Sequence, residues 1–406
     1  MKRTITAVAV GAVVALGAGL LTATSPAVAA ACTSSTCPTE VSGAAYRITQ
    51  STLSNAAAVH QALGGKSTHP ELSQVLADAN RVMSPLSSCR PSPAGLSPKA
   101  VFGFCWNSDD QDTDDSNLWF PQGITTTADA FGSRVYEGAQ AVAVTWYKRT
   151  SKTDEKAIQA RISLAPAEGY QTGTNRYRHV LLVEPTGSDN FAQIPCHAGG
   201  AMWYGHLLYV ACSSTIRVFD WDYLHEVKTT SLPGEGFGRQ SDGGYYANGN
   251  RYVMVQVGQI GRQDNNIQFS SLALDRASAP DRLVVSGYSD TAGVNLWRFD
   301  LDAATRLPSS NTAHDAYKLP ITYVQGAVTR GDRFWFSRST TNPQLLFWDR
   351  AKKTTPVAYG ADYGAESISY WSSGDGAGGV PDYLYTLTEH EGRREVFAVK
   401  QASFDG

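Results

Sequence analysis

One pattern recurs along this chain: a polar residue is followed by a small residue, then by a turn and two strands rich in aromatic residues. In one copy, His197 leads to the strand-like stretches 207–211 and 216–220. Similar copies begin at Gln325 and Glu366. A strand–turn–strand unit that is repeated around an axis is typical of a β-propeller. The sequence therefore predicts an all-β chain with this fold.

Two further copies begin at Gln122 and, with a weaker match, at Asp242. The starts at 122, 197, 242, 325 and 366 are separated by 75, 45, 83 and 41 residues, whereas one blade takes about 40–50 residues. We therefore predict a five-bladed propeller in which the first and third gaps carry insertions. Six or seven blades, or a β-sandwich with insertions, are the alternatives. The stretch 100–106 is expected to close the ring by completing a blade that the C-terminal end begins.

Residues 1–30 have the composition of a secretory signal peptide. Lys2 and Arg3 precede the apolar stretch 7–23, and an A-x-A cleavage site follows at 27–29. A membrane anchor is the alternative, but the apolar stretch is short for a span. No later stretch is long and apolar enough to cross a bilayer. We therefore expect a secreted, extracellular protein.

The segment after the signal differs from the rest of the chain. Residues 48–65 and 73–83 show apolar residues at helical spacing, and the Pro- and Ser-rich stretch 84–98 indicates a linker or fixed loop. From about residue 100 onward, short strands alternate with turn residues. The predicted domains are a signal peptide over 1–30, a small N-terminal helical segment with its linker over 31–98, and the propeller over 99–406.

The six cysteines of the chain should pair in an exported protein. Many connectivities are open to six cysteines. Nearness in the sequence favours three local bridges: Cys32–Cys37, Cys89–Cys105 and Cys196–Cys212. The third of these would join neighbouring strands of one blade.

The starts of the innermost strands would form the mouth of the central channel. The polar residues that converge there would be Gln122, His197, Asp242, Gln325 and Glu366, with Asp129 as a reserve candidate on the first blade. A small residue follows each of the five, because inner strands crowd toward the axis. We expect this ring, above all its members Gln122, His197, Gln325 and Glu366, to bind a ligand. The alternative is that these side chains only solvate the channel.

A reaction at this mouth would use Asp242 and Glu366 as a carboxyl pair, because glycoside cleavage needs two carboxyls beside the scissile bond. His197 is the third catalytic candidate, as a general base or a metal ligand. Tryptophans could stack on sugar rings, although most are expected to pack between blades: Trp106, Trp119, Trp203, Trp221, Trp297, Trp335, Trp348 and Trp371. The sequence contains no G-x-S-x-G elbow, Walker loop or H-E-x-x-H motif, so whether the protein is an enzyme stays open.

The acidic loop 107–117 is a candidate metal site. Asp110, Asp112 and Asp114 stand at alternate positions, which suits a hard cation such as Ca²⁺. The loop does not match an EF-hand, because Asp115 stands where that motif needs glycine. A solvated acidic loop is the alternative.

Segments 197–222 and 324–350 resemble blades of secreted bacterial β-propeller proteins, of the olfactomedin-like and NHL-like kind, in their order of small residue, turn and aromatic strands. The likeness covers about residues 100–400. It implies the fold, an extracellular location and a cation in the channel. It does not imply an enzyme, because propellers host many functions.

The leading hypothesis is an exported propeller that binds a polar small molecule, a glycan, a cell-wall fragment or a protein partner at its channel mouth. The alternatives are a carbohydrate-active hydrolase or lyase, and a structural or interaction protein. The net charge of −3, with no basic run among aromatic residues, predicts no nucleic-acid binding. The sequence has no basic amphipathic helix that would favour membrane binding. We also expect a monomer.

Overall fold

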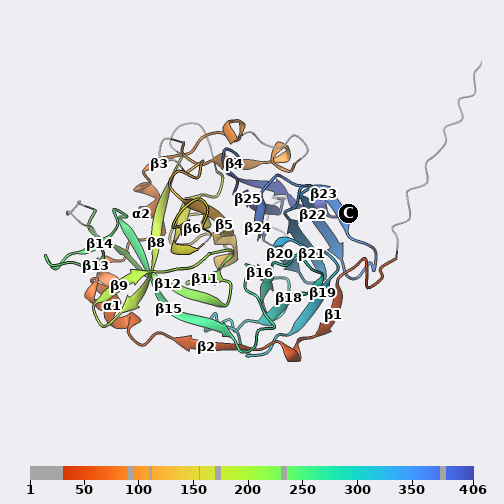
Figure 1. Cartoon of the computed structure of the whole chain (residues 1–406), viewed down its shortest axis with the longest axis horizontal. Coiled ribbons are helices and arrows are strands. Elements are labelled where there is room, and N and C mark those ends of the chain that lie inside the picture. The colour runs from red at the N-terminus through yellow and green to blue at the C-terminus, as the bar shows by residue number, and fades with distance from the viewer. Residues whose placement is uncertain are drawn as a thin grey trace, which may run out of the picture.

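The computed structural model describes residues 31–89, 95–108, 112–154, 156–169, 175–229, 236–374 and 381–406. Within these ranges the chain is mostly β-strand, as the sequence predicts (Figure 1). The predicted signal peptide, residues 1–30, lies outside the described residues. No helix within the described ranges is long and apolar enough to cross a membrane.

The building unit of the fold is a four-stranded antiparallel meander. The first consists of β5 (Trp119–Thr126), β6 (Ala141–Arg149), β7 (Ala157–Pro166) and β8 (Arg176–Thr186). The second consists of β10 (Ala201–Tyr204), β11 (Leu207–Cys212), β12 (Thr215–Glu226) and β15 (Tyr252–Arg262). The outer strands β15 and β8 pair in parallel, so these two meanders share one sheet.

The later meanders follow the same plan. One is β16 (Ser271–Asp275), β17 (Arg282–Ser286), β18 (Gly293–Asp300) and β19 (Asp315–Leu319). The next is β20 (Val324–Arg330), β21 (Arg333–Arg338), β22 (Gln344–Asp349) and β23 (Val357–Gly360). The last is β24 (Ala365–Trp371), β25 (Tyr383–Thr388), β26 (Glu395–Lys400) and β4 (Phe102–Cys105).

The first strands of the meanders surround a common centre, which makes the fold β-propeller-like (Figure 1). Their packing explains the small residue in each copy of the sequence pattern. A Cβ atom on Gly123 would lie 2.7 Å from the backbone of Gly200, and one on Gly200 would lie 2.5 Å from the Cα of Ser271. A Cβ atom on Gly326 would lie 2.8 Å from the Cα of Ser367. Larger side chains would force the strands apart.

The two ends of the described chain meet in the last meander. Strand β4, from the N-terminal side, pairs antiparallel with β26 near the C-terminus. The sequence prediction that 100–106 completes a sheet begun by the other end is confirmed. This pairing covers the edge of β26 with a strand from the other end of the described chain.

The segment before β4 runs along the outer edges of the sheets. Strand β1 (Thr39–Ser42) pairs with β19, and β2 (Ile48–Thr52) pairs with β15. Short helices and strands complete the described structure: α1 (Ala56–Ala62), α2 (Leu72–Ala77), α3 (Thr127–Ala130), β3 (Arg81–Val82), β9 (Asn190–Gln193), β13 (Phe237–Arg239) and β14 (Tyr245–Ala247). Single 3-10 turns occur at Gly43–Ala45, Gly65–Thr68, Leu86–Cys89, Ser97–Lys99 and Gln401–Phe404.

The helices predicted for this segment are shorter in the structure. The first, predicted over 48–65, forms only at Ala56–Ala62, because residues 48–52 pair with the open edge of β15 instead. The second, predicted over 73–83, ends at Ala77. Just beyond it, the carboxylate of Asp78 accepts hydrogen bonds from Arg251 and Tyr252. Tertiary pairing therefore overrides local helical propensity here.

All three predicted disulfides are confirmed. Cys32–Cys37, Cys89–Cys105 and Cys196–Cys212 are bridged, with Cα–Cα distances of 5.4, 5.7 and 5.0 Å. No cysteine among the described residues is free.

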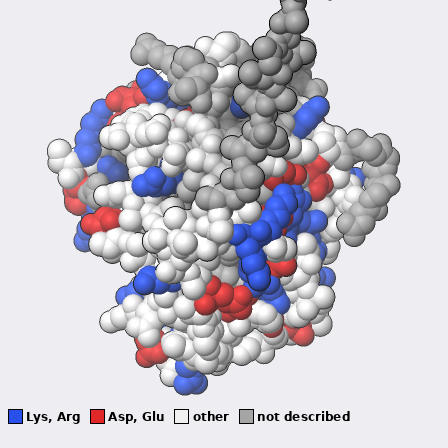
Figure 2. Space-filling model, turned by 90° about the vertical axis from the view of Figure 1, so that its right-hand side faces the viewer, with Lys and Arg blue, Asp and Glu red and all other residues white. Residues whose placement is uncertain are grey.

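The surface carries charges of both signs, and few large aromatic side chains of the described residues are exposed. On the face shown in Figure 2, Lys and Arg side chains lie among Asp and Glu side chains. The eight tryptophans considered for sugar stacking are all buried, so they pack in the core, as expected for most of them. The large exposed aromatic side chains in the described ranges are Phe131, Tyr288 and Tyr363.

Candidate functional site

A polar cavity, which we call the central pocket, lies where the first strands of the meanders begin. Its volume is about 320 Å³. The side chains that determine its chemistry are Gln122, Arg149, His197, Gln268, Gln325 and Glu389. Gln122, His197 and Gln325 belong to the ring predicted from the sequence. The structure therefore brings three of the five predicted residues to one cavity.

Glu366, a fourth member of the predicted ring, lies directly beneath this pocket on β24. Its side chain is buried, and its Oε1 accepts a hydrogen bond of 3.2 Å from Nε2 of Gln325. In a second contact of this kind, Nε2 of Gln122 donates a bond of 2.5 Å to Oε2 of Glu389. Each glutamine of the ring thus contacts one glutamate and holds its carboxyl group in place.

Glu366 and Glu389 are near enough to interact electrostatically, and we call them the carboxyl pair. Burial raises the pKa of Glu366 well above its usual value, and the nearby carboxylate of Glu389 raises it further. Burial also raises the pKa of Glu389, although His390 and the hydrogen bond from Gln122 act in the opposite direction. Two carboxyl groups that interact in a poorly solvated site hold protons more tightly than isolated ones. The pair can therefore donate as well as accept hydrogen bonds.

One wall of the pocket consists of stacked rings. The exposed imidazole of His197 stacks on Tyr147, with ring centroids 4.1 Å apart. The guanidinium of Arg149 lies 4.0 Å from the ring of Phe120, and its Nε donates to the Tyr147 hydroxyl at 2.8 Å. These contacts fix the rings and the guanidinium group in place before any ligand arrives.

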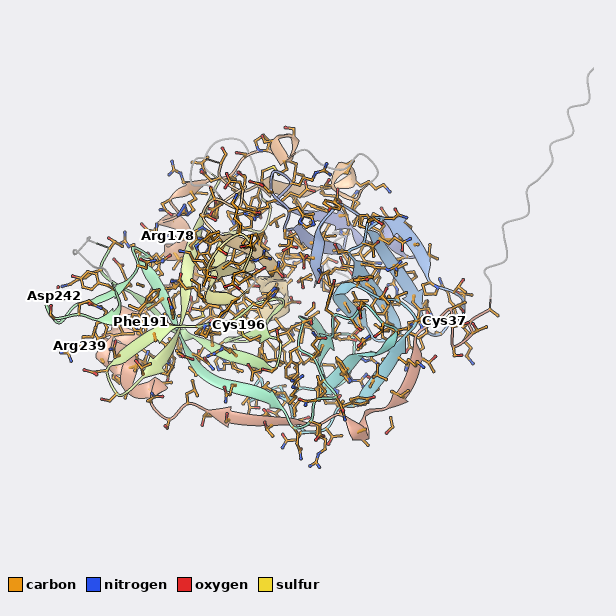
Figure 3. All side chains as sticks on the ribbon, viewed as in Figure 1. Cys37, Arg178, Phe191, Cys196, Arg239 and Asp242 are labelled. Atoms are coloured by element: carbon orange, nitrogen blue, oxygen red, sulfur yellow. A yellow bond between two sulfur atoms is a disulfide. The ribbon has the colours of Figure 1, made fainter. Side chains whose placement is uncertain are left out.

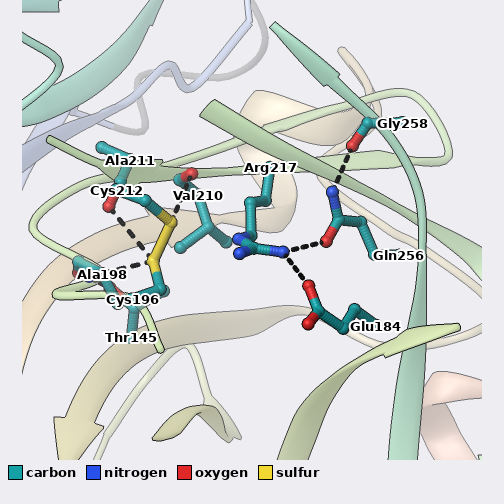
Figure 4. The surroundings of a disulfide bond; sticks show 10 residues. All are labelled: Thr145, Glu184, Cys196, Ala198, Val210, Ala211, Cys212, Arg217, Gln256 and Gly258. Carbon is teal, nitrogen blue, oxygen red and sulfur yellow. Dashed lines mark hydrogen bonds and ion pairs between the residues drawn. A yellow bond between two sulfur atoms is a disulfide. The ribbon is translucent and has the colours of Figure 1, made fainter. Parts of the chain in front are cut away.

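The Cys196–Cys212 disulfide braces this wall (Figure 4). Cys196 precedes His197, and Cys212 precedes Ser213, which also lines the pocket. The amide of Ala198 donates to Sγ of Cys196 at 3.3 Å, and its carbonyl accepts a bond of 2.7 Å from Thr145. The bridge thus ties together the two segments that carry His197 and Ser213.

Asp242 does not lie at the pocket, and the prediction that it starts an inner strand is wrong. It is exposed in the turn between β13 and β14, and Figure 3 places it at the periphery, far from Cys196. Its carboxylate accepts bonds from Lys228 at 3.1 Å and from the amide of Gly244 at 2.9 Å. The bond from Gly244 is the main reason why its pKa is lowered to about 2. The Asp-Gly-Gly sequence forms a hairpin turn, in which Gly243 has a φ of 75°.

The inner strand of that repeat is instead β16, and the residues before it line the pocket. Gln268, Phe269 and Ser270 all face the cavity. The step Ser270-Ser271 supplies the polar and small pair that the pattern requires. The strand-like stretch 251–257, which seemed to begin the repeat, belongs to β15 at the outer edge of the preceding meander.

Asp129, the reserve candidate, lies at the other end of the inner strands. It is buried, and its Oδ2 accepts bonds of 2.8 Å from the hydroxyls of Thr125 and Ser369. Burial raises its pKa to about 6. Because Thr125 is on β5 and Ser369 is on β24, Asp129 joins two neighbouring inner strands away from the pocket.

The proposed Ca²⁺ loop is only partly described, because Asp110 lies outside the described residues. Asp112 is fully buried, and its carboxylate contacts Arg161 at 2.9 Å, Tyr177 at 2.5 Å and His179 at 3.1 Å. Burial alone would raise its pKa, but His179 and Arg161 outweigh that effect and lower it.

Asp114 accepts bonds from Ser116 within its own loop. The described residues contain no cluster of three or more His, Cys, Asp or Glu side chains that could hold a metal ion. The Ca²⁺ site stays a prediction.

Two solved structures resemble this chain weakly, and no sequence family does. No protein-family model and no curated protein sequence matches the chain. Among solved structures, a GH43_1 enzyme from Xanthomonas citri is similar with a TM-score of 0.35 and 9% identity, over 75% of this chain and 92% of that one. A luciferin-regenerating enzyme is similar with a TM-score of 0.33 and 10% identity, over 78% and 97%. These similarities are too low to carry an argument about function.

Proposed function

We propose that this chain is a secreted five-bladed β-propeller that binds a neutral, hydroxyl-rich ligand, such as a glycan, in the central pocket. The blade count is inferred from the strand order, in which β5, β10, β16, β20 and β24 each begin a four-stranded meander. Secretion is supported by the three disulfides, which persist in oxidising compartments.

The hydrogen-bonding character of the pocket is the observation that carries this proposal. Gln122, Gln268 and Gln325 each offer an amide that both donates and accepts hydrogen bonds. The carboxyl pair can also do both, because its members hold protons more tightly than free glutamates. Sugar hydroxyls are themselves donors and acceptors, so this lining complements them. A phosphate or a metal ion would instead favour a lining of one charge.

The aromatic side chains of the pocket support the same ligand class. Tyr288 lines the cavity and is 39% exposed, and the exposed ring of His197, which stacks on the buried ring of Tyr147, lines it as well. Exposed flat rings beside amide groups suit the apolar face and the hydroxyl edge of a sugar ring at the same time.

The proposal is tested by affinity electrophoresis in gels that contain linear arabinan, arabinoxylan, mixed-linkage glucan or galactomannan. We expect at least one of these neutral polysaccharides to retard the wild-type protein, and we expect polygalacturonate to retard it less. Gln122→Leu and Gln325→Leu should weaken binding about tenfold each, because each removes an amide from the pocket lining and takes a hydrogen bond from the glutamate that it contacts. Gln263→Leu, at an exposed residue outside the pocket, is the matched control.

Failure of every neutral polysaccharide to retard the wild-type protein would refute this function. Equal binding by the wild type and both pocket variants would refute the assigned site.

The carboxyl pair also favours a second candidate function, cleavage of a glycosidic bond. A general acid in this reaction needs a raised pKa so that it carries a proton near neutral pH, and burial raises the pKa of both Glu366 and Glu389. Glu389 lines the pocket, so it could reach a ligand. It replaces Asp242 as the expected partner of Glu366.

Glu389→Gln separates binding from cleavage. The new amide can still accept the hydrogen bond from Gln122, so binding should change less than about threefold. Release of reducing sugars from the polysaccharides should fall at least about 100-fold if Glu389 transfers a proton. Glu391→Gln, in the same turn but exposed, is the control. If the wild-type protein releases no sugar from any of these polysaccharides, the hydrolase candidate is rejected and the binding proposal is unaffected.

A further inference from the structure

A second cavity opens on the same face of the molecule as the central pocket. Its volume is about 420 Å³, and its lining includes Thr341, Asn342, Tyr363 and Arg393. Tyr363 lies between β23 and β24, three residues before Glu366. We call this space the Tyr363 cavity. Both cavities fall within the size range of small-ligand sites.

Tyr363 gives this cavity an exposed flat ring. The side chain is 47% exposed. One side of the ring packs on His390 at a centroid distance of 4.6 Å, and the guanidinium of Arg393 lies 5.7 Å from the ring centroid. The fold gains little from an aromatic ring that stays half in water, whereas a ligand that stacks on it would gain a hydrophobic contact.

The loop that carries Tyr363 is anchored by hydrogen bonds to the segment that precedes β4. The carboxylate of Asp362 accepts bonds from the amides of Leu96 at 2.7 Å and Ser97 at 3.0 Å. Gly364 has a φ of 80°, and a Cβ atom there would lie 2.5 Å from the imidazole of His390. The ring of Tyr363 is therefore presented by a loop that is ordered before binding, which lowers the entropic cost of ordering a contact.

The same loop connects the two cavities. The carbonyl of Gly364 accepts a 3.0 Å bond from the amide of Glu389, which lines the central pocket. His390 and Arg393, which contact Tyr363, belong to the turn that begins at Glu389. One short turn thus supplies a carboxyl group to the central pocket and a guanidinium group to the Tyr363 cavity.

We propose that the Tyr363 cavity is a second sugar-binding subsite, so that the protein binds a glycan chain of several units that extends from the central pocket over Tyr363. A sugar ring would stack on Tyr363 while its hydroxyls bond to Asn342, Thr341 and Arg393. This inference rests on the proposed function of the central pocket, and it specifies the length of the ligand.

The test compares oligosaccharides of two and six units. Calorimetry would use arabino-, xylo-, cello- and manno-oligosaccharides with the wild type and with Tyr363→Ala, Tyr363→Phe and Phe131→Ala. Phe131 is a matched control, because it is an aromatic residue that is 36% exposed and follows α3, outside both cavities. Thermal unfolding of each variant would confirm that exposed substitutions leave the fold intact.

We expect the wild type to bind the hexasaccharide more tightly than the disaccharide. Tyr363→Ala should lower hexasaccharide affinity about three- to tenfold and leave disaccharide affinity unchanged, whereas Tyr363→Phe and Phe131→Ala should behave as the wild type. If affinity does not depend on chain length and Tyr363→Ala has no effect, the subsite is refuted and the central site stands. If no oligosaccharide binds the wild type, the proposed function fails, and the subsite fails with it.

Discussion

The Cys196–Cys212 disulfide couples stability to the central pocket, and its removal tests that coupling. The bridge closes a loop with a sequence separation of 16. Loss of a crosslink of this size costs about 3 kcal/mol through the entropy of the unfolded chain. With an unfolding entropy of roughly 2.1 cal/mol/K per residue over 406 residues, this lowers the thermal midpoint by about 4 °C. The double variant Cys196→Ser, Cys212→Ser also frees His197 and Ser213, and we expect oligosaccharide affinity to fall about three- to tenfold.

The chain supplies a control for this experiment. Cys89–Cys105 has the same sequence separation of 16, so its removal should cost the same amount of stability. Neither cysteine adjoins a residue that lines the central pocket. Calorimetry and thermal unfolding of both double variants should therefore show equal shifts in midpoint but weaker binding only without Cys196–Cys212. Equal affinity losses in the two variants would refute the idea that this bridge organises the pocket.

Three further predictions concern buried ionisable side chains. Asp112→Asn should lower the free energy of unfolding in urea by about 3–5 kcal/mol, because it leaves the buried Arg161 without its carboxylate; a loss below about 1 kcal/mol would contradict this. Burial raises the pKa of Glu395 to about 8, so the folded state binds a proton that the unfolded chain releases, and stability should fall as pH rises from about 4.5 to 8. Thermal unfolding of Glu395→Gln should show a smaller decline over this range, and an unchanged profile would reject the assignment. Burial lowers the pKa of His225 to about 3, and its Nε2 lies 2.9 Å from Nδ1 of His60; stability should therefore fall as pH drops from about 6.5 toward 3, and His225→Phe should lose less of it in acid than the wild type.

The parts of the fold that the sequence predicts are those with a local physical cause. The small residues near the starts of inner strands are visible in the sequence as Gly123, Gly200 and Gly326, where a side chain would collide with the neighbouring inner strand. The closing strand, β4, is a clear aromatic strand with no partner nearby in the sequence. The strand at Ile48–Thr52 could not be predicted, because its structure depends on the distant edge of β15.

The prediction of Asp242 failed for a related reason. An Asp-Gly-Gly sequence satisfies the pattern of a polar residue followed by a small one, but it also satisfies the backbone demands of a hairpin turn. An inner-strand start and a hairpin turn can be told apart only by how far the pair of residues stands from the next inner strand. Ser270 directly precedes the inner strand β16, whose first residue is Ser271, whereas Asp242 is followed by β14, the second strand of its own hairpin, and then by β15, which belongs to the preceding meander.

Glu389 was missed because the sequence argument considered only the starts of the inner strands. In an antiparallel meander, the start of the first strand lies beside the end of the second. The second strands β6, β11, β17 and β25 end at or near Arg149, Ser213, Tyr288 and Glu389, all of which line the central pocket. The pocket is therefore lined mainly from two positions of the repeat, one near the start of the first strand and one near the end of the second. This rule follows from topology alone, and it would have selected Glu389 from the stretch 383–392 without a structure.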